Sequence, residues 1–154
     1  MSDVRLVIEK SLRRLRVYQD EELIREFPIV LGSSPVGRKE IRGDRKTPEG
    51  EYYVCTRNPE SKYHLFLGLS YPNAHDALKG KEKGLISEES YRQIIERLNL
   101  KLRPPWDTEL GGEVGIHGHG TDKDWTAGCI AISNEAIEEL WELCQFGTPV
   151  TINP

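Results

Sequence analysis

Hydrophobic and polar residues alternate through most of the first 31 positions, with the period of two that half-buried β-strands show. The alternation is clearest over 4–9, and it resumes after an expected turn at 10–11. A second turn at 20–21 leads to a third strand over 23–31, in which Pro28 suits an edge or a bulge. The pattern predicts that the chain opens with a β-meander.

The rest of the chain carries further strand patterns around one long loop. Glycine, proline and charged residues dominate 32–50, which is typical of an irregular loop that ends in a turn. Strands are expected over 51–56, 63–69 and 150–152. Neither a repeat nor an interdomain linker separates these elements, so we predict one domain over 1–154.

Two segments have the 3.6-residue period of amphipathic helices. The first follows Ser87, a good N-cap with two glutamates after it, and the second opens at Asn134 and ends before Gly147. Their apolar faces comprise Tyr91, Ile94, Ile95 and Leu98 in the first helix and Ile137, Leu140, Trp141 and Cys144 in the second. The expected architecture is therefore mainly β, with two short helices.

The composition is that of an ordinary globular protein, with 154 residues and a formal net charge of −4. This mild acidity argues against a nucleic-acid-binding module, which usually carries a basic excess. No stretch approaches the roughly 18 consecutive apolar residues of a membrane span. Charges interrupt the N-terminal segment, so no secretory signal peptide is expected there. Either the protein stays in the cytoplasm or an export signal lies outside this sequence.

The three cysteines cannot all pair with one another, so at least one thiol is free or bonded elsewhere. Cys144 lies on the apolar face of the second helix and Cys55 lies in a strand pattern, and buried cysteines commonly pack as small hydrophobic residues. A disulfide between these two stays open as an alternative. Cys129 differs, because it follows Gly128 at a tight turn into the alternating segment 130–132.

The surroundings of Cys129 in the sequence fit a nucleophile. Glycine permits a sharp turn whose unobstructed amides, those of Ala127, Gly128 and Cys129, could bind a developing oxyanion. A base is available upstream, where His117 and His119 lie two residues apart and so point the same way along an extended chain. The combination predicts acyl transfer by a thiol and an imidazole.

Two other interpretations of the histidines remain open. The spacing of His117 and His119 also suits a metal site on a strand, which Asp122, Asp124 and Cys129 could complete. The pattern falls short of the HxHxDH motif of metallo-β-lactamases, because the last two positions of that motif differ here. Alternatively, both histidines could be purely structural.

Two motifs in the second half of the chain make the sequence resemble a known family. The segments IHG at 116–118 and TAGCIAIS at 126–133 resemble the signature of YkuD-like L,D-transpeptidase catalytic domains. The stretch 43–73, with its TPEG and YPN turns, resembles what these domains carry upstream, and PPWDTELGG and GTPVTI also fit. The likeness extends over essentially the whole chain.

The resemblance implies a single-domain β-sandwich of the L,D-transpeptidase catalytic type. It also implies a cysteine acyltransferase that acts on peptidoglycan stem peptides, without a cofactor, in the periplasm or cell envelope. By position, Cys129 matches the nucleophile, His117 the general base, and the Gly118 carbonyl the group that orients the imidazole. The amides of the cysteine turn match the oxyanion site, and Thr126 matches a Ser/Thr that could hold this turn.

Several residues are candidates for contacts with the substrate. The basic part of the long loop could hold stem-peptide carboxylates through Arg38, Lys39 and Lys46, although surface basic residues are usually just solvated. Thr126 and Ala127 belong to the same candidate surface through the cysteine turn. His119 has no position in the common signature, and it could tune the base, touch the substrate or be an exposed loop residue.

Three departures from the family pattern affect the expected reaction. Ala131 stands where many members have Arg, the interval between His117 and Cys129 is short, and about 75–107 looks like an enlarged insertion whose helix could form a lid. The first two features resemble atypical members in which hydrolysis accompanies transfer. An L,D-carboxypeptidase, an amidase that releases a peptidoglycan-linked lipoprotein, a metal-binding hydrolase and an inactive peptidoglycan-binding domain therefore stay as alternatives.

Overall fold

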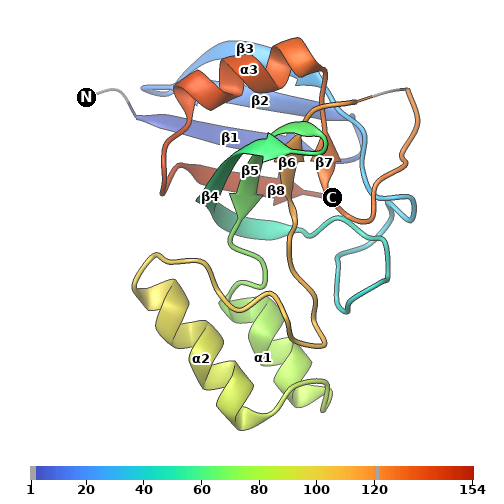
Figure 1. Cartoon of the computed structure of the whole chain (residues 1–154), viewed down its shortest axis with the longest axis vertical. Coiled ribbons are helices and arrows are strands. Elements are labelled where there is room, and N and C mark those ends of the chain that lie inside the picture. Colours follow the sequence, from blue (N-terminus) through green and yellow to red (C-terminus); the bar gives the residue numbers. More distant parts are fainter. Residues whose placement is uncertain (1–2, 121) are drawn as a thin grey trace.

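A computed structural model describes residues 3–120 and 122–154 as one curled sheet with three helices (Figure 1). The elements are β1 (Val4–Glu9), β2 (Arg14–Gln19), β3 (Glu22–Pro28), β4 (Gly50–Ser61), β5 (His64–Leu69), α1 (Ala74–Glu82), α2 (Glu88–Asn99), β6 (Gly115–His117), β7 (Ile130–Ala131), α3 (Asn134–Leu143) and β8 (Pro149–Asn153). Their order across the sheet is β3-β2-β1-β8-β4-β5-β6-β7. The expectation of a mainly β domain is confirmed.

The opening meander of β1, β2 and β3 is present, with antiparallel pairing throughout. The expected third strand over 23–31 is wrong in its last residues, because β3 ends at Pro28, which has no amide hydrogen to donate. The chain then leaves this edge, and Val30 forms a bridge with Ala131 of β7 while Gly32 forms one with Thr126. The segment after β3 therefore runs beside the cysteine turn.

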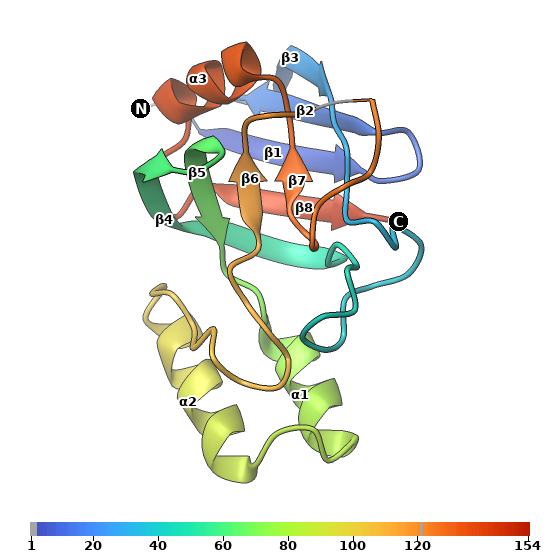
Figure 2. The same ribbon diagram turned by 45° about the vertical axis from the view of Figure 1, so that its right-hand side comes forward.

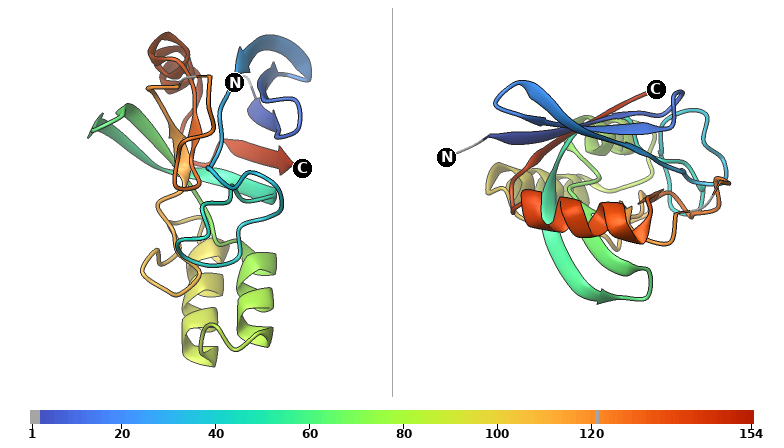
Figure 3. Two further views of the ribbon diagram at one scale, coloured as in Figure 1. Left: turned by 90° about the vertical axis from the view of Figure 1, so that its right-hand side faces the viewer. Right: turned by 90° about the horizontal axis from the view of Figure 1, so that it is seen from above.

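Strand β8 joins the meander to the rest of the sheet. It is parallel to β1 and antiparallel to β4, so it lies between segments that are far apart in the sequence. Strand β4 extends to Ser61, beyond the expected 51–56, and forms a long hairpin with β5 that projects from the body (Figure 3). Side chains from both halves of the sheet, together with Ile137 and Leu140 of α3, form the main hydrophobic core.

Helices α1 and α2 form an insertion that lies apart from the strands (Figure 2). They pack on a second, smaller core of Ala77, Ile86, Ile94 and Leu110. Helix α2 begins after Ser87, as expected, whereas α1 was not expected as a helix. No helix in the described part of the chain is long and apolar enough to cross a membrane.

A buried polar cluster fixes the start of α1 to the sheet. Asn73 caps the helix and exchanges hydrogen bonds with Asp76 in a capping box. The Asp76 carboxylate also accepts a hydrogen bond from Tyr52 Oη at 2.6 Å and pairs with Arg38 at 2.8 Å. Just before this cap, the peptide bond between Tyr71 and Pro72 is cis.

Candidate active site

His117 and Cys129 come together because β6 and β7 are adjacent parallel strands. His117 is the last residue of β6 and pairs with Ala131, and Cys129 immediately precedes β7. Both residues line one cavity of about 490 Å³. The structure thus brings together the two residues that the sequence motifs single out.

His117 is held in a defined orientation within an aromatic environment. Its Nδ1 lies 2.8 Å from the Gly118 carbonyl oxygen, which can only accept a hydrogen bond. In the neutral imidazole Nδ1 therefore carries the proton and Nε2 is the acceptor. The ring is buried and stacks on Tyr63, with 4.5 Å between the ring centroids. Burial lowers the pKa of His117, the Gly118 hydrogen bond partly opposes this shift, and nearby His119 adds to it.

Cys129 is a neutral thiol in the resting protein. Burial raises the pKa of Cys129 to about 11, against the smaller lowering effects of a hydrogen bond from the Gly115 backbone and of the Lys39 charge. Its Sγ lies 3.4 Å from the Glu113 carbonyl oxygen. An adjacent imidazole can lower the pKa of a cysteine thiol. In the resting state the pKa of Cys129 is raised instead, because desolvation outweighs the favourable contacts and His117 is itself neutral.

Thr126 and Gly128 hold the turn that presents Cys129. The Thr126 hydroxyl donates to the Cys129 carbonyl oxygen at 2.7 Å and accepts from the Gly128 amide at 3.1 Å. Gly128 has φ +145°, and a Cβ at this position would lie 2.8 Å from the Lys46 carbonyl oxygen, so only glycine fits. The Gly128 amide is thus engaged, which corrects the expectation that it serves as an oxyanion donor.

The backbone amides of Ala127 and Cys129 remain available as oxyanion donors. Neither amide has a hydrogen-bond acceptor within residues 3–120 and 122–154. Ala127 is exposed, whereas Gly128 and Thr126 are buried. Two donors of this kind at a nucleophile suit the tetrahedral intermediate of acyl transfer.

The comparisons with known proteins agree with this geometry. A profile of the YkuD family, the L,D-transpeptidase catalytic domain, matches residues 3–152. The chain belongs to the YkuD family.

Individual relatives of this YkuD domain are distant. YafK of Escherichia coli K12, described as a candidate L,D-transpeptidase, is 27% identical over 159 residues, which cover 96% of this chain and 51% of YafK. The helical cell shape determining protein Pgp2 of Campylobacter jejuni is 25% identical, with a TM-score of 0.68 over 98% of this chain and 47% of Pgp2. An L,D-transpeptidase of Mycobacterium smegmatis shares the fold, at 12% identity and a TM-score of 0.59 over 99% of this chain and 59% of its own. The chain spans about half the length of the curated relatives it matches.

Three basic residues of the long loop, Arg38, Lys39 and Lys46, are engaged within the fold. Arg38 binds Asp76 at 2.8 Å, and Lys39 is buried, with its Nζ 3.0 Å from Asp44 Oδ1. Lys46 Nζ donates to the Val36 carbonyl oxygen at 2.8 Å. None of these three basic side chains lines the cavity of Cys129. The expectation that this trio holds substrate carboxylates is therefore corrected, since their charges and donors are used to order the loop.

His119 and the acidic residues near it take other positions. His119 is exposed and does not line the cavity, and its ring meets Tyr63 edge-on at 6.0 Å. The Asp124 carboxylate binds Arg13 at 2.7 Å and accepts from the Leu31 amide at 2.9 Å. Within residues 3–120 and 122–154, no three His, Cys, Asp or Glu side chains converge in a manner suited to a metal ion.

Cys55 and Cys144 are free and buried, as the packing interpretation predicts. Burial raises the pKa of each thiol to about 12, so neither is reactive near neutral pH.

The sequence patterns did not identify the aromatic and acidic walls of the cavity. Tyr63, Phe66, Trp106 and Glu113 all line it with the cysteine and the histidine. Trp106 and Glu113 belong to the segment that returns from the insertion to β6, and the motif PPWDTELGG was the only local signal that could have drawn attention to Trp106. The positions of these walls follow from how β5 and the returning segment meet β6, which requires the tertiary fold.

Proposed function

We propose that this YkuD domain is an L,D-transpeptidase that transfers the acyl group of a peptidoglycan stem peptide through a thioester on Cys129. The observation that carries the proposal is the shared cavity of Cys129 and His117, in which the Gly118 carbonyl leaves Nε2 of His117 as the proton acceptor. The low pKa of His117 supports this role, because the imidazole is neutral and able to accept a proton at neutral pH.

The reaction starts from a neutral thiol and a neutral imidazole. His117 Nε2 takes the thiol proton as Sγ bonds to the carbonyl carbon at the L-centre of diaminopimelate. The amides of Ala127 and Cys129 stabilise the resulting oxyanion. The carbon–nitrogen bond to the terminal D-alanine then breaks, His117 returns the proton to the departing amine, and a thioester remains. Because the thiol pKa is about 11, proton transfer and attack are expected to occur together once substrate excludes water.

An acceptor then resolves the thioester, and the reaction products distinguish which acceptor is used. An amine of a second stem peptide gives a cross-link, and water gives trimming, as in an L,D-carboxypeptidase. A lipoprotein attached to peptidoglycan would be released if water resolved a thioester formed at that linkage. In each case the substrate is peptidoglycan, so the proposed place of action is the periplasm or cell envelope.

Purified protein incubated with tetrapeptide muropeptides tests the proposal. We expect release of D-alanine with formation of dimers or tripeptides, and loss of both in Cys129→Ala and His117→Ala. Cys55→Ala is the matched control, because this thiol lies outside the cavity and its removal should leave turnover in place. Turnover by Cys129→Ala, or its absence in the wild-type protein, would contradict the proposal. Mass spectrometry after exposure to a carbapenem provides a second readout, with an adduct expected on Cys129 only.

A further inference from the structure

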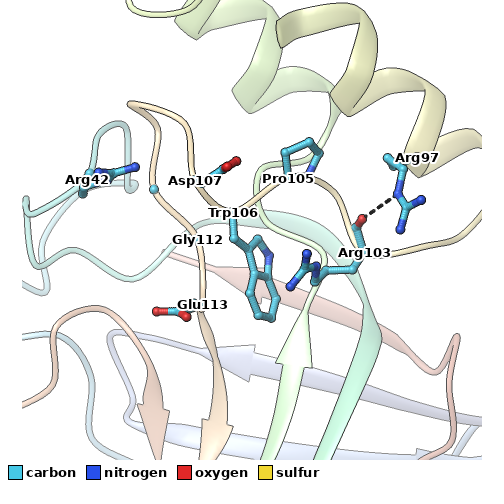
Figure 4. A pocket seen from close by; sticks show the side chains of 9 residues that line it. Arg42, Arg97, Arg103, Pro105, Trp106, Asp107, Gly112 and Glu113 are labelled. Atoms are coloured by element: carbon cyan, nitrogen blue, oxygen red, sulfur yellow. Dashed lines mark hydrogen bonds between the residues drawn. The ribbon is translucent and has the colours of Figure 1, made fainter.

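A second and larger cavity adjoins the cavity of Cys129. It measures about 820 Å³, and we call it the arginine pocket, after the side chains of Arg42, Arg97 and Arg103 that line it (Figure 4). In Figure 4, Arg42 approaches from the long loop on one side, and Arg97 of α2 and Arg103 lie on the other side, with Trp106 between them. The long loop, the helical insertion and the segment that leads into β6 thus together line one basic hollow.

The arginine pocket is continuous with the proposed site of catalysis. Trp106 and Glu113 line both cavities. The Glu113 carbonyl oxygen is also the group that lies 3.4 Å from Cys129 Sγ. A substrate bound with its carbonyl at Cys129 can therefore extend past Trp106 into the pocket.

Among residues 3–120 and 122–154, the three arginines have no carboxylate partner of their own. Arg42 donates to the Thr108 carbonyl oxygen at 2.8 Å, and Arg97 Nε donates to that of Arg103 at 3.0 Å. The Arg103 guanidinium lies 4.9 Å from the centre of the Trp106 ring. Within the described residues none of the three forms an ion pair, although Asp107 and Glu113 also line the pocket. This contrasts with Arg38, whose charge is paired with Asp76.

We propose that the arginine pocket binds the free carboxylate on the side chain of the residue whose carbonyl Cys129 attacks. In the stem peptide this is the carboxylate at the D-centre of diaminopimelate, so the inference rests on the proposed function. Guanidinium groups present paired donors that match a carboxylate, and exposed arginines without a carboxylate partner keep their remaining donors available. The pocket thereby selects peptides that carry this carboxylate over those in which it is an amide.

The test compares two stem tetrapeptides that differ only at this carboxylate, one with the free acid and one with the amide. For the wild-type protein we expect a KM roughly tenfold lower for the acid, in line with one or two charge-assisted hydrogen bonds at an exposed site, and similar kcat values. Arg103→Gln and Arg42→Gln should raise KM for the acid and leave that for the amide nearly unchanged. Arg92→Gln, on the same helix as Arg97 but outside the pocket, is the control and should preserve the preference.

The outcomes separate this inference from the proposed function. Equal KM values for acid and amide in the wild-type protein, or a preference that survives in Arg103→Gln and Arg42→Gln, would overturn the pocket assignment and leave L,D-transpeptidation in place. If the wild-type protein turns over neither peptide, the proposed function fails. In that case calorimetry with Cys129→Ala decides the pocket, because tighter binding of the acid supports it and equal or absent binding overturns it.

Discussion

The ring of Tyr63 stacks on the imidazole of His117, with 4.5 Å between the centroids and 22° between the planes. Tyr63 thereby covers one face of the imidazole and contributes to the burial that lowers the pKa of His117. The Tyr63 backbone carbonyl also accepts a hydrogen bond from the Gly118 amide at 2.9 Å. One residue therefore shields the imidazole and holds the strand end whose carbonyl orients it.

Replacing Tyr63 by alanine should shift the acid limb of the pH–activity profile to higher pH. Burial is the main cause of the low pKa of His117, so admitting water raises this pKa toward its ordinary value near 6.5. The proposed mechanism needs the neutral imidazole, and activity should therefore begin to fall at a higher pH in Tyr63→Ala. The pH dependence of kcat/KM measures this. Tyr63→Phe keeps the ring and should retain the wild-type limb, and an unchanged limb in Tyr63→Ala would contradict the prediction.

The Cys129 thiol should react slowly with simple alkylating agents at neutral pH. Its pKa is raised to about 11 by burial, so the rate of modification by iodoacetamide should keep rising through pH 9 and 10. An unperturbed cysteine would level off near its pKa of about 8.5. Modification is followed by mass spectrometry, with Cys129→Ala as the control for the two buried thiols. A plateau below pH 9 would show that the resting thiol is more acidic than the structure indicates.

Gly128→Ala should impair both stability and activity, whereas Gly147→Ala should affect stability alone. Both glycines have positive φ, but the added Cβ at 128 meets the Lys46 carbonyl oxygen at 2.8 Å and the one at 147 meets nothing within 4 Å. For a residue with a Cβ, a sparsely populated positive-φ conformation alone costs roughly 1–3 kcal/mol. The clash at 128 should also displace the turn and lower kcat/KM by about 100-fold. Thermal unfolding and turnover assays check both effects. Equal losses of activity in the two variants would argue against the predicted effect of the clash at 128.

Asp44→Asn should weaken the dependence of stability on acid pH. Burial by itself would raise the pKa of Asp44, but hydrogen bonds from the backbone amides of Glu40, Ile41 and Lys46 and from Lys39 outweigh it, and the net pKa is lowered. A carboxylate with a depressed pKa in the folded protein contributes stability that is present above its unfolded pKa of about 3.9 and is lost as pH falls through the lower folded value.

The free energy of unfolding, measured from pH 7 down to pH 2, checks this prediction. The wild-type protein should lose stability more steeply below about pH 4 than Asp44→Asn, which starts from a lower stability at neutral pH. Glu142→Gln, an exposed site on α3, should follow the wild-type curve. Parallel curves for the wild type and Asp44→Asn would show that the carboxylate does not act in this way.

Local patterns sufficed for the elements whose residues alternate or recur regularly. The period of two over β1 and β2 marks side chains that are fully buried, such as Leu6, Ile8, Leu15 and Val17. The motif around Cys129 indicated the candidate nucleophile, and the IHG segment indicated the candidate base, because a glycine-flanked turn and a strand end are local features. Their meeting in one cavity follows from the pairing of β6 with β7.

Other features depend on partners that are distant in the sequence. Helix α1 contains four charged residues and a glycine, so its weak apolar face gave little sign of a helix that the Asn73 cap and the second core stabilise. Lys39 resembled a free cation, yet Asp44 and the surrounding chain bury it. The Gly128 amide looked unobstructed, but the Thr126 hydroxyl occupies it. In each case a tertiary contact decides a property that the local residues leave open.

The position of β8 between β1 and β4 has a consequence for how the chain folds. Leu6 lies opposite Val150 and Ile8 opposite Ile152, so the centre of the sheet is closed by contacts between segments of extreme sequence separation. Such contacts are slow to form, because chain entropy must be lost before they contribute any stability. The opening meander and the β4–β5 hairpin cannot belong to one cooperative unit until β8 has docked. We therefore expect folding in milliseconds to seconds, with β8 docking late and setting the rate.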